Sequence, residues 1–108
     1  YNYDGTLDED KIAKSLCAKT NWKLTSEAGT PGYEPKNNNS TGFTALPGGY
    51  RYGYDGYFYS IGKSGNWWSS AEIRVSYAHY RYLYYDFKNL YNDFSSKAHG
   101  LSVRLVRD

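Results

Sequence analysis

The sequence predicts an α+β domain with one N-terminal helix, short antiparallel strands and long loops. Apolar residues recur at helical spacing only near the N-terminus, a Gly-, Pro- and Asn-rich stretch follows, and short aromatic runs separated by turn residues come after it. A chain of 108 residues can bury roughly two-thirds of its unfolded surface around a single core. We therefore expect one domain, residues 1–108.

The helix is predicted over residues 8–19. Ile12, Ala13 and Leu16 recur at helical spacing, which predicts one buried stripe. Cys17 lies beside this stripe and is the only cysteine, which excludes an internal disulfide and a Cys-based zinc site. No His or basic cluster adjoins it, so we expect a small buried hydrophobe rather than a reactive thiol.

Turn residues and alternation predict the remaining elements. Residues 25–41 are expected to form a loop, and the Asp55-Gly56 pair between aromatic runs is a hairpin signal. Alternation predicts strands over residues 78–85 and 101–106, the last with Leu101, Val103 and Leu105 on a core-facing side. Trp67 and Trp68 are expected to serve mainly in packing.

Tyrosine is the most unusual component of the sequence. Aromatic residues make up 19% of the chain, and 14 residues are Tyr. On a strand, Tyr80, Tyr82 and Tyr84 share one face, while Leu83 and Tyr85 supply residues for the core. Exposed Tyr offers a large, stiff contact area with a hydroxyl group, as in antibody paratopes. The pattern favours a binding surface over a buried face.

Several function classes are disfavoured by the sequence. The net charge is +2 with scattered basic residues, so we expect no nucleic-acid binding, and no apolar run predicts membrane insertion. No nucleophile, base and orienting group occur as a set, so we expect neither an enzyme nor a cofactor. We expect no metal site, because His79 and His99 lack a third ligand and Glu72, Asp86 and Asp93 lack calcium-ligand spacing.

Four segments resemble a known family. They are STGFTALPGGYR (residues 40–51), GYFYSIG (56–62), GNWWSSAE (65–72) and KAHGLSVRLVRD (97–108). In this order they are similar to the Fibrobacter major paralogous domain family, which implies a C-type-lectin-like fold. The G-W-R-L-P-T-like opening of that family does not occur in the sequence, so we expect this segment to be either removed or replaced, and Leu101 stands where the family usually has Phe.

The resemblance also implies a variable region, at about residues 73–99, of the kind that a diversity-generating retroelement rewrites. Such elements mutate adenines, so AAY asparagine codons become NNY codons, which cannot encode Trp, Met, Gln, Lys or Glu. Lys88 and Lys97 would therefore be scaffold positions, whereas Ser95 and Ser96 are reachable. The candidate ligand-binding residues are Ile73, Arg74, Ser76, Tyr77, Tyr80, Tyr82, Tyr84, Asp86, Phe87, Tyr91, Asp93, Phe94 and His99.

The expected function is that of a ligand-binding display module of phage or bacterial origin. Its target would be an unknown protein or a glycan, met outside the cell or at a cell or virion surface. Two alternatives stay open. One is a carbohydrate-binding lectin-like module, since aromatic rows stack on sugar rings, and the other is a structural surface or pilus-tip domain without diversification. Oligomerisation is also left open.

Overall fold

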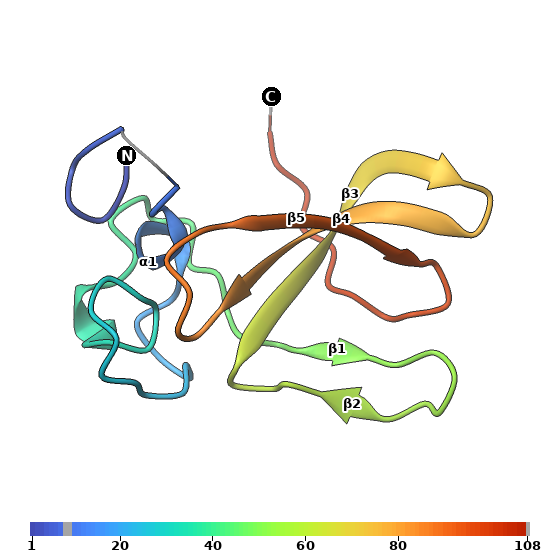
Figure 1. Ribbon diagram of the computed structural model, residues 1–108, viewed down its shortest axis with the longest axis horizontal. Coiled ribbons are helices and arrows are strands. Elements are labelled where there is room, and N and C mark those ends of the chain that lie inside the picture. Colours follow the sequence, from blue (N-terminus) through green and yellow to red (C-terminus); the bar gives the residue numbers. More distant parts are fainter. Residues whose placement is uncertain (8–9, 108) are drawn as a thin grey trace.

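The computed structural model describes residues 1–7 and 10–107 and is mostly β with little helix (Figure 1). The helical elements, on the left of the view, are α1 (Ala13–Leu16) and a 3₁₀ helix (Pro35–Asn37). The strands form one two-stranded and one three-stranded antiparallel sheet, an arrangement compatible with the predicted α+β class. They are β1 (Tyr50–Arg51), β2 (Phe58–Tyr59), β3 (Ser64–Arg74), β4 (Tyr77–Tyr84) and β5 (Tyr91–Ser96).

α1 is much shorter than the helix predicted over residues 8–19, whose positions 8 and 9 lie outside the described residues. In a longer helix, the carbonyl groups of its residues would accept N–H groups four positions further on. Here they accept hydrogen bonds from a distant loop instead, which ends the helix after one turn. The donor and acceptor pairs are Asn39 to Lys14, Thr41 to Ser15 and Ala45 to Leu16, at N–O distances of 3.1, 3.1 and 2.8 Å.

A buried lysine ties the loop over residues 25–41 to α1. Lys14 is 6% exposed, and its ammonium group donates to the carbonyl oxygens of Thr30, Tyr33 and Glu34 and to Oδ1 of Asn38. The Asn38 side chain is buried as well and donates to two further carbonyl groups of the loop and of the segment after α1. These contacts satisfy backbone groups that no regular secondary structure pairs.

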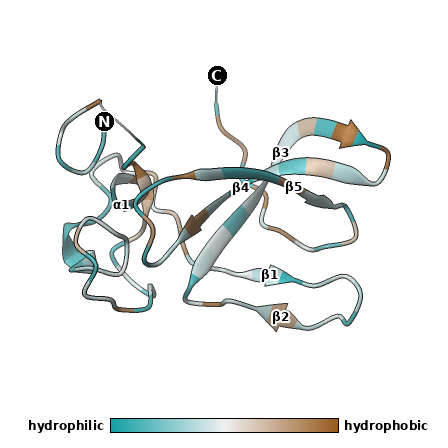
Figure 2. Ribbon diagram, in the orientation of Figure 1, coloured by the Kyte–Doolittle hydropathy of each residue, from teal (hydrophilic) through white to brown (hydrophobic). Residues whose placement is uncertain are grey.

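The larger sheet has the order β3-β4-β5, with β4 in the middle. Tyr80 of β4 lies between Trp68 of β3 and Asp93 of β5. Irregular register beyond Trp68 bends the outer half of β3, which continues into an exposed turn with β4. Figure 2 shows that β5 is hydrophilic over much of its length, so the sheet does not depend on an apolar β5 face.

The prediction of a strand over residues 101–106 is wrong. Within the described residues the segment pairs only through a bridge between Ser102 and Trp67. Beyond it the chain points away from the body of the molecule (Figure 1), with Val103 71% and Leu105 93% exposed. No neighbouring backbone among residues 1–7 and 10–107 continues the pairing, so the alternating pattern has no sheet to join. Arg104 instead lies over the Phe43 ring, 3.9 Å from its centroid.

The core lies between α1 and the inner end of β4. It is centred on Cys17, Trp22 and Leu83, all buried, with Ala13 and Ala45 beside them. The burial of Cys17 confirms the packing role predicted from the sequence. Fully burying a side chain such as that of Leu83 contributes roughly 1.5–3 kcal/mol.

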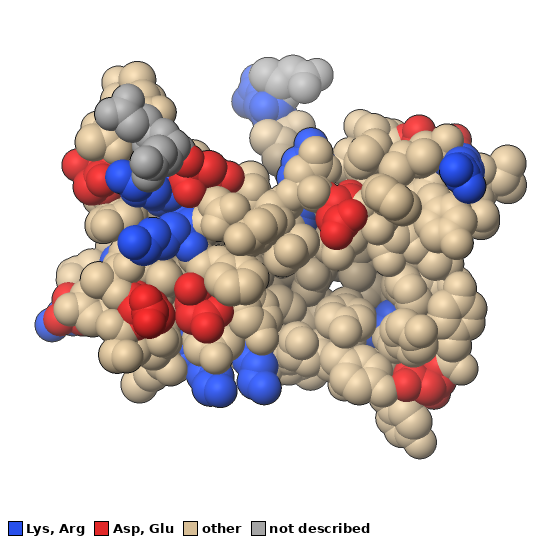
Figure 3. Space-filling view, in the orientation of Figure 1, with Lys and Arg blue, Asp and Glu red and all other residues tan. Residues whose placement is uncertain are grey.

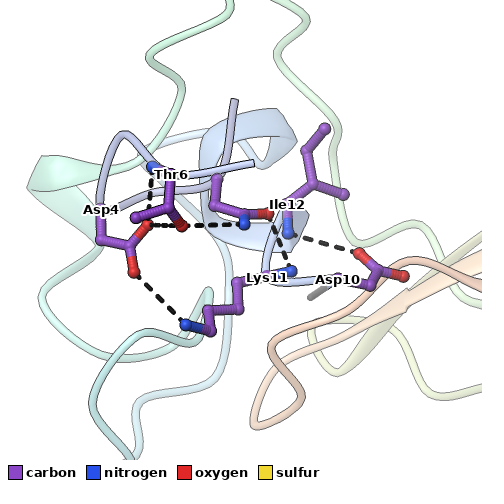
Figure 4. A network of polar contacts seen from close by, with 6 residues as sticks. Asp4, Thr6, Asp10, Lys11 and Ile12 are labelled. Atoms are coloured by element: carbon purple, nitrogen blue, oxygen red, sulfur yellow. Dashed lines mark hydrogen bonds and ion pairs between the residues drawn. The ribbon is translucent and has the colours of Figure 1, made fainter. Parts of the chain in front are cut away.

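The N-terminal loop is held by a polar network rather than by the core (Figure 4). Asp4 accepts hydrogen bonds from the backbone and the hydroxyl group of Thr6, and it forms an ion pair with Lys11 at 3.5 Å. Asp10 accepts the N–H group of Leu90, which links the start of the α1 region to the entry of β5. Asp10 thus adds a polar contact between the two halves of the chain to the packing of the core.

Candidate binding surface

One face of the larger sheet carries a continuous row of aromatic rings. Alternation along β4 places Tyr80 and Tyr82 on the same side, and the register brings Tyr91 of β5 beside Tyr82. Tyr82 stacks on Tyr80 and on Tyr91, with ring centroids 5.6 and 4.9 Å apart. Phe87 continues the series at 5.3 Å from Tyr91. We call these residues, together with Trp68 and Tyr84 at the two ends, the aromatic row.

The side chains of the aromatic row are partly exposed to solvent, and their rings are held by stacking on one another. Its tyrosines are half-buried and Phe87 is exposed. Burial raises the pKa of Tyr80 and of Tyr82, and the effect is reinforced by the Asp93 carboxylate at Tyr80 and by Tyr91 at Tyr82. The phenol groups therefore stay protonated at neutral pH and offer both a donor and an acceptor.

Six further candidates from the sequence lie outside the aromatic row. Phe94 and Tyr77 lie on the face of the sheet opposite the aromatic row, where their ring centroids are 6.3 Å apart, so Phe94 does not share a face with Tyr80, Tyr82 and Tyr84. Asp86 is half-buried in the turn after β4, and its Oδ1 has no hydrogen-bond partner among the described residues. Ile73 and Arg74 form the exposed end of β3, and Ser76 lies in the exposed turn between β3 and β4.

Asp93 lies beside Tyr80 and also has a structural role. Its carboxylate accepts the backbone N–H of Phe94 at 2.8 Å. β5 is an edge strand of the larger sheet, where unpaired N–H groups are ordinarily free to meet another chain. The Asp93 side chain therefore occupies one backbone N–H donor of this edge, that of Phe94.

A second aromatic cluster surrounds the smaller sheet, and His99 belongs to it. The His99 ring stacks on Tyr52 at 4.8 Å and meets the edge of Tyr54 at 5.5 Å. Its Nδ1 accepts the N–H of Gly53 at 3.0 Å. Tyr59 connects Tyr52 to Tyr50, at 6.3 and 5.9 Å. We call Tyr50, Tyr52, Tyr54, Tyr59 and His99 the hairpin cluster.

The backbone explains why His99 reaches the hairpin. Arg51 and Gly100 exchange two hydrogen bonds of 2.8 Å, which join β1 to the segment after β5. A Cβ atom on Gly53 would lie 2.2 Å from the carbonyl oxygen of Ala98, so only glycine permits this approach. The sequence pattern predicts the hairpin but not its part in the surface. The density of Tyr in residues 50–59 was the available signal.

Between the aromatic row and the hairpin cluster lies a cavity of about 260 Å³. Tyr80 lines it from the larger sheet, and Tyr52 and His99 line it from the other side. Most of the surface over the sheets in Figure 3 is uncharged, while charged side chains gather over the N-terminal half. The site is therefore an aromatic surface with few charged side chains and one hollow in it.

Other kinds of site have little support in the described part of the chain. No group of three or more His, Cys, Asp or Glu residues among residues 1–7 and 10–107 is arranged to hold a metal ion. Burial raises the pKa of the Cys17 thiol, which keeps it protonated. In the same residues, no helix has the length and apolar character needed to cross a membrane.

Fold and surface together define a small, mostly β domain with aromatic side chains displayed on two adjoining sheets. The sequence matches the model of the Fibrobacter succinogenes major domain over residues 3–107. The chain therefore belongs to this family, which confirms the family resemblance drawn from its motifs. No curated protein matches the sequence, and no solved structure matches it.

Proposed function

We propose that the chain is a non-enzymatic binding module whose contact surface is the aromatic row. The stack of Tyr80, Tyr82 and Tyr91 carries this proposal, because three partly exposed rings are held in contact with one another. Stacked rings lose little side-chain entropy when a partner covers them. Tyr and Trp are also the residues that most often dominate binding energy at interfaces.

The family supports a finer version of the proposal. We infer a C-type-lectin-like fold in which residues from about 73 to 99 vary between copies through a diversity-generating retroelement. The exposure of Ile73, Arg74, Phe87 and Phe94 supports it, because substitution is tolerated where a side chain does not hold the core. The module would act outside the cell, at a cell or virion surface, on a protein or glycan target.

A double substitution tests the contact surface. Tyr82→Ser with Tyr84→Ser removes two rings of the aromatic row, and we expect loss of binding on an array of purified cell-surface proteins and glycans. Lost ring contacts should cost about 1–3 kcal/mol, which leaves the domain folded at 25 °C. The matched control is Tyr1→Ser with Tyr57→Ser, two exposed tyrosines outside the row. Binding that survives in the first variant, or disappears equally in the control, contradicts the proposal.

Diversification has its own test in the source DNA. We expect a near-duplicate of the segment encoding residues 65–104 downstream, which differs from it only at adenines. Differences at all four bases, or no repeat in the complete locus, would leave a binding module with a fixed surface. The carbohydrate-binding alternative then gains weight, because a fixed aromatic surface suits a fixed ligand.

A further inference from the structure

The cavity between the two sheets has a buried polar side chain in its lining. Asn66 lines it and is only 6% exposed. Its amide nitrogen donates to Oγ of Ser64 at 2.9 Å and to the carbonyl oxygen of Gly49 at 3.3 Å. These bonds fix the orientation of the amide. Within the described residues, its Oδ1 accepts no hydrogen bond and is left as an acceptor for a ligand.

The opposite wall presents a donor. Because Nδ1 of His99 accepts the N–H of Gly53, the neutral ring carries its proton on Nε2. Stacking on Tyr52 holds the ring in this orientation. The hydroxyl groups of Tyr80 and Ser95, both of which line the cavity, can donate and accept. The cavity thus combines aromatic walls with neutral hydrogen-bonding groups from several directions.

This lining selects a class of ligand. No Asp, Glu, Lys or Arg side chain in the described part of the chain lines it, so a phosphate or carboxylate group would lose its hydration without a counter-charge. A purely apolar ligand would leave Asn66 Oδ1 unpaired, which typically costs 1–3 kcal/mol. A neutral ring with hydroxyl groups around its edge and C–H groups on its faces satisfies both requirements. At about 260 Å³ the cavity is smaller than most drug-sized sites, so it suits a single ring.

We propose that this cavity is a metal-independent subsite for one neutral pyranose ring. The inference rests on the proposed binding role and adds a ligand class for one part of the surface. The hairpin cluster supplies one wall and the larger sheet supplies the other. The subsite therefore joins residues outside the proposed variable region, such as Tyr52, to residues inside it, such as Tyr80.

The test is a titration of the ¹⁵N-labelled full chain with the methyl glycosides of glucose, galactose, mannose and N-acetylglucosamine. The Gly53 amide reports on His99, and the Asn66 side-chain amide reports on the base of the cavity. We expect at least one glycoside to shift both signals with a Kd on the order of 1 mM, unchanged by a chelator. Tyr80→Phe with Ser95→Ala removes two hydroxyl groups and should weaken binding about tenfold.

A matched control separates the cavity from the general surface. Tyr57→Phe with Ser70→Ala removes the same groups from exposed positions that do not line the cavity, and it should leave the Kd unchanged. The inference is overturned if no glycoside shifts the two signals at 100 mM, a ceiling about two orders above the expected Kd. It is also overturned if the Tyr80 and Ser95 variant binds like the parent, or if N-acetyl-tyrosinamide alone binds.

The two proposals fail separately. Loss of array binding in the Tyr82 and Tyr84 variant without any glycoside effect would keep the binding module and remove the pyranose subsite. Glycoside shifts at Gly53, together with unaltered array binding in that variant, would keep the pyranose subsite and remove the aromatic row as the contact surface.

Discussion

Lys14 extends its ammonium group into a set of oxygen atoms from the loop that follows α1. Its acceptors lie up to 24 residues away in the sequence, and three of the four are backbone carbonyl groups. Nothing in the local pattern around residue 14 indicates such partners, and the sequence predicts only a loop over residues 25–41. Burial of Cys17, in contrast, was predictable because its apolar neighbours in sequence are also its neighbours in space.

Replacing Lys14 should therefore destabilise the domain strongly. Lys14→Met keeps most of the side-chain volume but leaves several carbonyl groups and the Asn38 amide oxygen without a donor. Each buried unsatisfied group costs roughly 1–3 kcal/mol, so we expect a loss of about 3 kcal/mol or more in the free energy of unfolding. Urea denaturation measures it, with the exposed Lys19→Met as the control. Equal denaturation midpoints for the two variants would show that the buried contacts contribute nothing.

At the scale of elements, the hairpin of β1 and β2 confirms the prediction from the Asp55-Gly56 pair. Asp55 accepts the N–H of Tyr57 at 2.9 Å and the hydroxyl group of Tyr59, so the turn residue also binds the strand that follows it. α1 shows the opposite case, because its helical pattern was outcompeted by long-range acceptors and donors. Local signals predict an element when its hydrogen bonds are local.

The bond between Asp55 and Tyr59 predicts a pH window for the hairpin. The Tyr59 hydroxyl lowers the pKa of Asp55 below 3.8. The contribution of this hydrogen bond to the stability of the hairpin is therefore present above pH 3.8 and is lost as the pH falls through the lowered pKa. The same bond raises the pKa of Tyr59 above 10.0, so the contribution is present below that value and is lost as the pH rises through the raised pKa. NMR titration of the Tyr59 ring measures this effect.

Asp55→Asn serves as the comparison in that titration. We expect Tyr59 to ionise at a lower pH in this variant than in the parent, because the carboxylate that opposes its ionisation is gone. Tyr80, whose pKa is raised by burial and by Asp93 rather than by Asp55, should ionise alike in both proteins. Identical curves for Tyr59 would mean that the bond is absent in solution.

At the scale of the whole molecule, the terminal segment is where prediction from sequence failed most clearly. The alternation of Leu101, Val103 and Leu105 predicts a core strand, but only the start of the segment pairs with the sheet. Alternation identifies which residues share a side and not whether a neighbouring strand exists. The same limit applies to the site. Alternation correctly predicts that Tyr80, Tyr82 and Tyr84 share one face, whereas the hairpin cluster depends on the pairing of Arg51 with Gly100.

The exposed terminal segment makes a prediction that distinguishes it from the core. Val103→Asp should change the free energy of unfolding by no more than about 0.5 kcal/mol, as is usual for a solvent-exposed position. Leu83→Ala, at a residue that is 1% exposed, should cost roughly 2–5 kcal/mol. Thermal melting of both variants measures the difference. A Val103→Asp chain that fails to fold would mean that this segment packs against the domain.

The carboxylate that covers the Phe94 amide has a consequence for solubility. An edge strand with free donors is a template for cross-strand association between molecules, and β5 has neither Pro nor Lys along its length to discourage it. Every substitution of Asp93 by a residue without an acceptor uncovers one amide on that edge. If this position varies as proposed, copies of the domain that differ in what they bind will also differ in how readily they aggregate. Selection on such a repertoire would then act on colloidal behaviour as well as on affinity.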